Sequence, residues 1–293
     1  MALKKKTAVV VGNFDGIHLG HLYLLSRLKE EAKKRNLQPL VVSFEPHPVK
    51  VLKKSENFCL LSSAEEKREI IGKQLGLDLE ILPFTYQLAQ TKPEEFIEKY
   101  LLEKFSAGLI IAGYDWRFGK GASGDIKLLK ELASRHGCEV IQEKPYRVGG
   151  KIVSSSLIRE LLKKTRLKEA TLYLGHPYWI KRKIQKGRGL ASKLGFPTLN
   201  FHEVDDLCLP NGVYAVYCDG YPAVANLGYA PTLKGEHRLL EVHILQDGFS
   251  ISSQPRISFQ NFLREEMAFK SVYQLVNQIK KDIQRAKNLL LTD

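Results

Sequence analysis

Apolar residues in the first half of the chain follow two alternating patterns. One is a short continuous run rich in β-branched residues, typical of a strand buried in a parallel sheet, at residues 7–11, 40–44, 79–82, 109–112 and 138–142. The other is the spacing of an amphipathic helix. One such segment follows the first run and extends to about residue 35, and another begins at residue 63 and extends to about residue 75. This order predicts an α/β fold with a doubly wound, mostly parallel, Rossmann-like sheet.

Polar residues mark several helix starts in this half. Residues 63–66 and 91–94 predict capping boxes, in which a Ser or Thr and a Glu three residues later satisfy each other's backbone N–H groups. Pro93 falls near the first helical position, where the missing N–H of proline is tolerated. We predict a further helix over residues 125–136 and another that begins at the serines 154–156.

After about residue 175 the pattern changes to short strand-like runs separated by turn residues, at 179–185, 212–218, 223–227, 240–245 and 256–259. That spacing predicts an antiparallel β-barrel or sandwich. The chain closes with an amphipathic helix capped by Ser271, whose apolar face is predicted to pack on the barrel through Val272, Leu275, Val276, Ile279, Ile283 and Ala286. We therefore predict two domains, residues 1–170 and 175–293, with their boundary near residues 164–176.

Composition agrees with two folded domains. The chain has 293 residues, or roughly two domains of 150, and its 44% hydrophobic and 26% charged residues exclude disorder as the main state. No apolar run approaches the ~20 residues of a membrane helix, and the N-terminal run is too short for a signal peptide. We expect a cytoplasmic protein with no membrane partner.

Net charge points to anionic ligands. Lys and Arg number 45 against 32 Asp and Glu, an excess of 13, which suits nucleotides, nucleic acid or a membrane surface, although a solvated basic surface is an equal alternative. The basic residues are scattered without a block of five, so a nucleic-acid tail is not indicated and nucleic acid is not an expected partner.

The four cysteines are Cys59, Cys138, Cys208 and Cys218. They form no C-x-x-C pair, which argues against a zinc site. Cys138 and Cys218 lie in strand-like runs and are predicted to be reduced core residues. A disulfide framework is not expected in a cytoplasmic chain of this size.

The strongest chemical signal follows the first strand and opens the first helix, with the sequence Gly12-Asn13-Phe14-Asp15-Gly16-Ile17-His18-Leu19-Gly20-His21. The glycines allow close approach of a ligand, and the helix N-terminus offers free N–H groups to phosphates. His18 and His21 are three residues apart, so both imidazoles share one helical face and can stabilise a leaving pyrophosphate. A pair of capping histidines beside a glycine turn is the alternative. The coincidence of strand, glycines, histidines and helix favours a functional loop.

Three further strand ends carry polar candidates. His47 stands in Phe44-Glu45-Pro46-His47-Pro48, where a rigid proline turn is the alternative. Asp115 stands in the segment 113–119, where its position at a strand's carboxyl end favours ligand contact over a buried Asp–Arg pair. The segment 154–159 offers Ser155, Ser156 and Arg159 as a second phosphate clamp, against plain capping by serine.

These motifs, in this order and spacing, resemble the prokaryotic bifunctional riboflavin kinase/FMN adenylyltransferase family, also called FAD synthetase. The resemblance runs nearly end to end, with one departure at Ser156-Leu157, where the family usually has Thr and a polar or basic residue. It implies a nucleotidyltransferase domain that transfers AMP from ATP to FMN with Mg²⁺ and without a covalent enzyme intermediate. By this resemblance the phosphates of ATP would be held by His18, His21, Ser155 and Arg159, and the substrate site lined by Asn13 and Asp115. The other expected nucleotide or substrate contacts are Gly12, Phe14, Asp15, Gly16, His47 and Ser156.

In the second half, the segment 195–200 resembles the family signature G-F-P-T-A-N. A Thr198 hydroxyl and an Asn200 amide oxygen two residues apart on a strand can share one Mg²⁺, and Pro197 is an expected substrate contact. Glu241 matches the family's base, which takes the proton of the riboflavin 5′-hydroxyl. An ordinary turn and a solvent-facing strand Glu are the alternatives.

The kinase half departs from the family pattern at several positions. Ala191-Ser192 replaces a Gly-Arg pair, Leu199 replaces Ala, Ala230 replaces an Arg, and residues 247–250 replace an acidic D-L-Y-G stretch. Phosphoryl transfer depends on positioning and charge neutralisation, so these losses weaken it unless Lys186, Arg188 or Lys193 substitute. An active, a slow and a purely structural kinase half all stay open.

Two functions other than FAD synthesis are alternatives for this sequence. The first is a nucleotidyltransferase acting on another phosphate acceptor, such as a pantetheine or nicotinamide phosphate, with a non-catalytic barrel; such enzymes usually lack this C-terminal domain. The second is an RNA-binding protein with a synthetase-like fold, but the chain has no K-M-S-K-S-like loop and no basic strand interleaved with aromatics. The expected partners are small molecules (ATP, FMN and riboflavin), and a weak homo-oligomer is left open.

Overall fold

The computed structural model describes residues 5–52, 58–187, 190–232 and 235–291. The chain divides into two compact units. The first comprises Met1–Phe58 and Ser62–Ser154, and the second comprises Cys59–Leu61 and Ser155–Asp293. None of the helices within the described ranges is long and apolar enough to cross a membrane.

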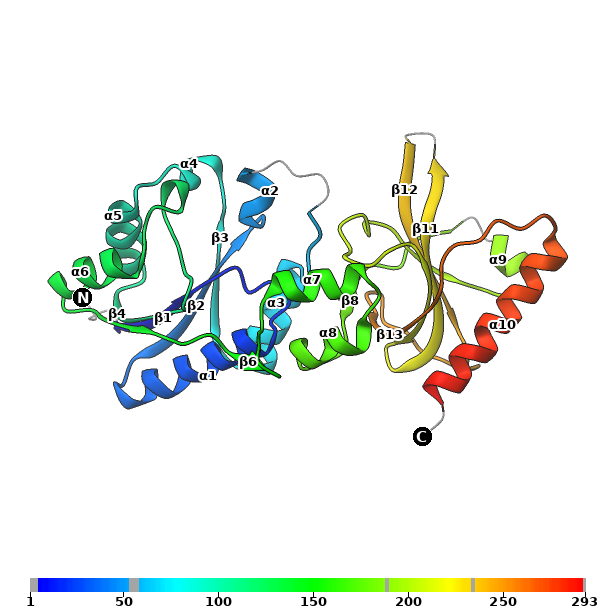
Figure 1. Ribbon diagram of the computed structural model, residues 1–293, viewed down its shortest axis with the longest axis horizontal. Coiled ribbons are helices and arrows are strands. Elements are labelled where there is room, and N and C mark those ends of the chain that lie inside the picture. Colours follow the sequence, from blue (N-terminus) through cyan, green and yellow to red (C-terminus); the bar gives the residue numbers. More distant parts are fainter. Residues whose placement is uncertain (1–4, 53–57, 188–189, 233–234, 292–293) are drawn as a thin grey trace. The chain divides into compact units, whose positions relative to one another are not determined.

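The first unit is built on a parallel five-stranded sheet, as predicted (Figure 1). Its strand order is β3-β2-β1-β4-β5, with bounds β1 (Thr7–Val11), β2 (Gln38–Glu45), β3 (Asp78–Pro83), β4 (Ala107–Ala112) and β5 (Glu139–Gln142). Every residue of β1 is buried, which explains its continuous apolar sequence. The order reverses between β1 and β4, so the loops that follow these two strands meet at the switch point where such sheets bind ligands.

Helices cover both faces of this sheet. Contacts with β1, β2 and β4 come from α1 (Leu19–Lys34), while η2 (Phe96–Lys104) and α6 (Ile126–Arg135) pack on β4 and β5 around a core that includes Ile97, Leu101 and Leu129. The helix that begins at residue 64 consists of α3 (Ala64–Lys67) and a wider π-type continuation, η1 (Arg68–Gln74). The remaining elements are short: α2 (Pro48–Leu52), α4 (Tyr86–Ala89), α5 (Pro93–Glu95), η3 (Lys120–Ala122), β6 (Arg147–Val148) and β7 (Lys151–Ile152).

One of the two predicted capping boxes is wrong. Ser63 and Glu66 form the reciprocal pair that the sequence predicts, and Asp125 caps α6. At the second position the N-cap is Lys92, without a side-chain capping bond, and Pro93 takes the first helical position. Thr91 follows the C-cap of α4, Gln90, and donates its hydroxyl to the carbonyl of Gln87 in that helix.

The second unit carries a curled antiparallel sheet, as predicted (Figure 1). It begins with α7 (Ser155–Lys163) and α8 (Leu167–Leu174), and α9 (Leu190–Lys193) follows the first strand. The strand order is β8-β13-β10-β11-β12-β9, with bounds β8 (Trp179–Lys181), β9 (Leu199–Phe201), β10 (Gly212–Cys218), β11 (Tyr221–Thr232), β12 (Gly235–Ile244) and β13 (Arg256–Arg264). The strand predicted over 179–185 therefore ends at Lys181.

The closing helix α10 (Val272–Leu290) begins as predicted, with the Ser271 hydroxyl accepting from the Gln274 N–H. It contacts β10, β11 and β13, and its buried residues are Asp282, Ala286 and Leu290. The prediction that Val272 packs on the sheet is wrong, because this side chain is 61% exposed. The helix is buried through its C-terminal half, so its first turn contributes little to the core.

Packing divides the chain between Ser154 and Ser155, earlier than the predicted linker near residues 164–176. The reason is that α8 contacts β13 and α7 contacts α8, so both helices group with the second unit. A domain boundary in the polypeptide at residues 170–175 stays a prediction.

The expectation that the chain has no disulfide is wrong. Cys59 and Cys208 are bonded, although 149 positions separate them in sequence. Residues 59–61 lie beside the loop that contains Cys208, where the Leu60 N–H donates to the Asp206 carbonyl over 2.9 Å. This non-local contact brings the two sulfurs together, and nothing in their sequence spacing indicates it. Cys138 and Cys218 are buried free thiols, as predicted.

The disulfide makes the stability of the second unit sensitive to reductant. Closing so long a loop restricts the unfolded chain, and we expect reduction to lower the free energy of unfolding by about 2–4 kcal/mol. Thermal unfolding with and without dithiothreitol measures the effect. Cys208→Ser is the matched control, because its unfolding temperature should be the same with and without the reductant. Burial raises the pKa of Cys138 to about 11 and that of Cys218 to about 12, which keeps these two thiols unreactive. A wild-type transition that is indifferent to reductant would contradict the bond.

Two candidate active sites

The loop after β1 adopts an unusual backbone. Phe14 and Ile17 have positive φ angles of 46° and 40°, a region that is costly for bulky and β-branched residues. Both side chains are only 1% exposed, so tertiary packing holds the strained loop in place. Such strain concentrates at functional sites.

Asp15 and Ser62 fasten the same loop. Asp15 is 1% exposed, and its carboxylate accepts the Ser62 N–H over 2.9 Å. The Gly16 N–H donates to the Ser62 hydroxyl over 2.8 Å, and the φ of 86° at Gly16 suits glycine. The buried Asp15 and Phe14 side chains therefore support the loop from inside the unit, and contact of these two residues with a substrate stays a prediction.

A buried lysine, which the sequence analysis missed, lies beneath the loop. Lys67 of α3 is 1% exposed, and its ammonium donates to the Ser43 hydroxyl over 3.5 Å. Ser43 in turn donates to the Asn13 carbonyl over 3.1 Å. Burial lowers the pKa of Lys67, and the carboxylates of Asp15 and Glu45 oppose that shift. In its protonated form Lys67 would add positive charge beneath the loop that the sequence predicts to hold phosphates.

The two histidines of the loop adjoin at the N-terminus of α1. Their rings stack with centroids 3.6 Å apart, and His18 is the N-cap, accepting the His21 N–H on Nδ1. Because Nδ1 accepts, the proton of neutral His18 lies on Nε2. The structure thus brings the two imidazoles together at a helix N-terminus, an arrangement suited to phosphate groups, and their binding of phosphate stays a prediction.

A pocket of about 340 Å³ adjoins this loop in the first unit. Gly12 and Asn13 line it, together with Arg117 and aromatic side chains that come from β2, η2 and the segments after β3 and β4: Phe44, Phe84, Phe96, Trp116 and Phe118. The Trp116 and Phe118 rings stack at 4.5 Å. The sequence analysis missed this aromatic lining. Its signals were Phe44 in the segment 44–48 and Trp116 and Phe118 in the segment 113–119.

The structure separates two other predicted residues from this pocket. His47 is 4% exposed, accepts the Val49 N–H on Nδ1 and packs against the Phe58 ring at 4.7 Å. Asp115 is exposed and is not part of the described pocket lining. The buried Asp–Arg pair considered for this segment is not found in the described residues, since Arg117 instead pairs with Asp125 at 3.8 Å on the surface.

Ser155, Ser156 and Arg159 lie in α7 of the second compact unit. Arg159 donates its Nε to the carbonyl of Cys59 over 3.0 Å, within the same unit. Their predicted grouping with His18 and His21 around ATP stays a prediction.

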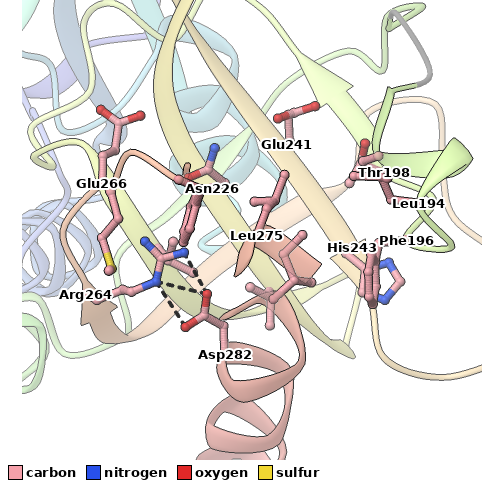
Figure 2. A pocket seen from close by; sticks show the side chains of 16 residues that line it. Leu194, Phe196, Thr198, Asn226, Glu241, His243, Arg264, Glu266, Leu275 and Asp282 are labelled. Atoms are coloured by element: carbon pink, nitrogen blue, oxygen red, sulfur yellow. Dashed lines mark hydrogen bonds and ion pairs between the residues drawn. The ribbon is translucent and has the colours of Figure 1, made fainter. Parts of the chain in front are cut away.

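The second unit holds its own pocket, of about 390 Å³, on the curled sheet (Figure 2). Strand register assembles it, because Glu241 of β12 lies opposite Asn226 of β11 and opposite Asn200 of β9. The lining combines polar groups with apolar side chains, among them Leu194, Phe196, Val213, Val224, Met267, Phe269, Leu275 and Ile279. A molecule with both an apolar and a polar part suits this lining.

Glu241 is half-buried and lines the pocket, as Figure 2 shows. Burial raises the pKa of its carboxyl above the usual range, and a hydrogen bond from the Asn226 amide opposes the shift. A carboxylate made more basic by burial is suited to accept a proton. Of the two interpretations of this residue, the structure favours a site carboxylate over a solvent-facing one.

Thr198 belongs to the lining of this pocket, and Asn200 lies opposite Glu241 in the neighbouring strand. Asn200 is 7% exposed and donates its Nδ2 to the Thr198 carbonyl over 3.2 Å. That bond orients the Asn200 Oδ1 as an acceptor. A Cβ on Gly187 would come within 2.3 Å of the Asn200 amide nitrogen, so this side chain requires a glycine beside it.

An ion pair that the sequence analysis missed forms part of the pocket wall. Arg264 donates from Nε over 3.0 Å and from Nη2 over 2.8 Å to Oδ2 of Asp282, which is dashed in Figure 2. The pair joins the end of β13 to α10, and no sequence signal links these positions. Arg188, considered as a substitute for the missing arginine, and the side chain of Ala230 lie outside the described residues.

Together, the fold and the two sites define a two-unit transferase, with a doubly wound nucleotide-binding unit and an antiparallel unit that carries a carboxylate pocket. Comparison with known families agrees with this class. The FAD synthetase family model matches residues 1–157, and the riboflavin kinase model matches residues 174–290.

Similar proteins cover nearly the whole chain. Bifunctional riboflavin kinase/FMN adenylyltransferases from Buchnera aphidicola subsp. Schizaphis graminum and Escherichia coli K12 are each 32% identical, over 97% and 94% of this chain and 94% and 90% of their own lengths. The chain belongs to the bifunctional riboflavin kinase/FMN adenylyltransferase family. A solved structure from Streptococcus pneumoniae, described as a macrolide-efflux protein, shares the fold with a TM-score of 0.82 and 30% identity, covering 98% of this chain and 96% of that one.

Proposed function

We propose that the chain makes FAD from riboflavin in two ATP-dependent steps. The second unit phosphorylates riboflavin to FMN, and the first unit transfers AMP from ATP to FMN and releases pyrophosphate. The observation that carries the proposal is the pair of stacked histidines at the N-terminus of α1, adjoining an aromatic pocket lined by Gly12 and Asn13 of the same loop.

In the first unit, a phosphate oxygen of FMN attacks the α-phosphorus of ATP while the bond to the β-phosphate oxygen breaks. The Nε2–H of His18, the His21 ring and the free N–H groups of α1 face the charge that develops on the phosphates. The isoalloxazine ring is placed in the aromatic pocket, where offset stacking and burial of apolar surface favour a flat heterocycle.

In the second unit, Glu241 accepts the proton of the riboflavin 5′-hydroxyl as the oxygen attacks the γ-phosphorus of ATP and ADP leaves. Its raised pKa supports this role, because burial makes the carboxylate a better base. The apolar wall formed by Leu275 and Ile279 of α10 offers the flavin ring a surface that excludes water.

The residues present fit a Mg²⁺ ion that is held largely by substrate. Thr198 and Asn200 would hold it through neutral oxygens, as the sequence predicts, and the ion would neutralise charge on the phosphates of ATP. Among the residues that the structure describes, no cluster of three His, Cys, Asp or Glu side chains could hold a metal alone. This agrees with a cation that enters with its nucleotide.

Trp116 offers a test of the flavin pocket. We expect Trp116→Ala to raise the KM for FMN about tenfold and to change the KM for ATP less than twofold, because a stacked aromatic surface is lost while the histidine loop is unchanged. Steady-state FAD formation at varied FMN and ATP measures both constants. Tyr86→Ala, at an exposed aromatic outside the described lining, is the matched control. Equal changes in both constants would contradict the placement.

The experiment that tests the whole proposal gives purified protein ATP and Mg²⁺, with riboflavin in one reaction and FMN in the other, and separates the flavins by chromatography. FAD in both reactions is the expected result. FAD from FMN alone would restrict the activity to the first unit and make the departures at Ala191, Ser192 and Leu199 disabling. No FAD in either reaction would overturn the proposal and direct the search to other phosphate acceptors.

We place the protein in the cytoplasm, because both proposed reactions consume ATP. The proposed partners are small molecules, and neither reaction requires nucleic acid or a membrane.

A further inference from the structure

The strand pairing between β9 and β12 stops just before the turn 195–198, whose Thr198 is proposed above to hold Mg²⁺. Leu199 pairs with Val242, Asn200 with Glu241 and Phe201 with Leu240, and Thr198 lies outside this ladder. Pro197, the preceding residue, has no N–H with which to extend it. The backbone ladder alone therefore leaves Thr198 at a free end.

His243 continues the connection where the backbone pairing ends. Its Nδ1 lies 2.8 Å from the Pro197 carbonyl, and since a carbonyl only accepts, Nδ1 carries the proton. The Phe196 ring packs edge-on against the imidazole at 5.8 Å, so the turn is held by a hydrogen bond and an aromatic contact (Figure 2). These two contacts flank Thr198 on the N-terminal side, and the ladder flanks it on the other.

The same strand carries Glu241. Residues 241 and 243 are two apart on β12, so their side chains share one face, and both line the pocket with Thr198. One rigid element thus supports the proposed base and, through Pro197, the turn that presents the Thr198 oxygen. A shift of this turn relative to β12 would change the distance between Thr198 and Glu241.

We propose that His243 is a positioning residue for riboflavin phosphorylation, which fixes the turn 195–198 so that Thr198 is held for ATP and Mg²⁺ at a constant distance from Glu241. The inference rests on the proposed function of the second unit. His243 acts through the Pro197 carbonyl and does not touch the reacting atoms. The competing role for a residue in this pocket wall is direct contact with the flavin.

The test compares His243→Leu, which removes the donor, with His243→Asn, whose side-chain amide can donate from nearly the same point as Nδ1. For the Leu variant we expect the KM for ATP and the Mg²⁺ concentration at half-maximal rate to rise about tenfold, toward the upper end of what one hydrogen bond accounts for. The KM for riboflavin should change less than twofold. The Asn variant should recover most of the loss. His237→Leu, at an exposed histidine of the same strand, should match the unsubstituted protein.

Hydrogen exchange in the protein without nucleotide gives a readout that does not depend on activity. Peptides covering residues 195–200 should exchange faster in His243→Leu than in the unsubstituted chain, and His243→Asn should restore their protection. Thermal unfolding of the second unit reports whether each variant is folded. If the Leu variant is unfolded, the Asn variant alone decides, with unchanged ATP and Mg²⁺ constants supporting the inference and altered ones overturning it.

A rise confined to the KM for riboflavin, or an Asn variant that behaves like Leu, would overturn the inference and leave the proposed function standing. An unsubstituted protein that forms no FMN from riboflavin would overturn the proposed function of this unit and the inference with it.

Discussion

His21→Ala is expected to reduce the formation of FAD from FMN by a factor of about 10²–10³, the loss measured when one preorganised donor to developing charge is removed. His21 stacks on His18 at the N-terminus of α1. The variant should fold, because His21 is only half-buried and its backbone N–H still bonds to His18. Initial rates at saturating ATP and FMN measure the effect.

The matched control is His136→Ala, at an exposed histidine that follows α6. It should leave both reactions unchanged. Phosphorylation of riboflavin by the His21 variant is a second, internal control, because that reaction belongs to the other unit. Near-normal FAD formation in the His21 variant would refute the assignment of the histidine loop.

Glu241→Gln should lower the phosphorylation of riboflavin by a factor of about 10²–10⁴, the contribution of a positioned general base. The amide is nearly isosteric with the carboxylate and keeps a partner for Asn226, so the pocket should retain its shape. FMN formation from riboflavin measures the loss, and the KM for riboflavin should change little. Formation of FAD from FMN should be unaffected.

Glu265→Gln, at an exposed carboxylate close in sequence to the pocket lining, is the control for loss of charge. If both reactions fell equally in the Glu241 variant, the division of labour between the two units would be wrong. If riboflavin phosphorylation were unchanged, the base would have to be another group.

The sequence by itself determined the two architectures. The run at residues 7–11 is apolar throughout because β1 is covered on both faces, and its β-branched residues favour strand over helix. The bounds of β1 match the prediction residue for residue. Local chemistry was equally readable at Ser63 and Ser271, since a capping bond spans only three residues and depends on nothing distant.

Two local predictions failed because the surroundings of the residue, and not its spacing in the sequence, decided its contacts. Thr91 has the spacing of a cap, yet the carbonyl of Gln87 at the end of α4 takes its hydroxyl. Val272 has the periodicity of a buried residue, yet α10 is buried through its other end. Periodicity tells which face of a helix is apolar but not how much of its length is covered.

For the sites, the sequence singled out the histidine loop and Glu241 as candidates because each belongs to a short contiguous motif. It did not indicate that the Asp15 carboxylate accepts the Ser62 N–H. The aromatic pocket, the Arg264–Asp282 pair and the Cys59–Cys208 bond were not readable, since each joins segments that are far apart in sequence. Only the tertiary structure decides such contacts, because they depend on which chain segments the sheets bring together and not on any local spacing of residues.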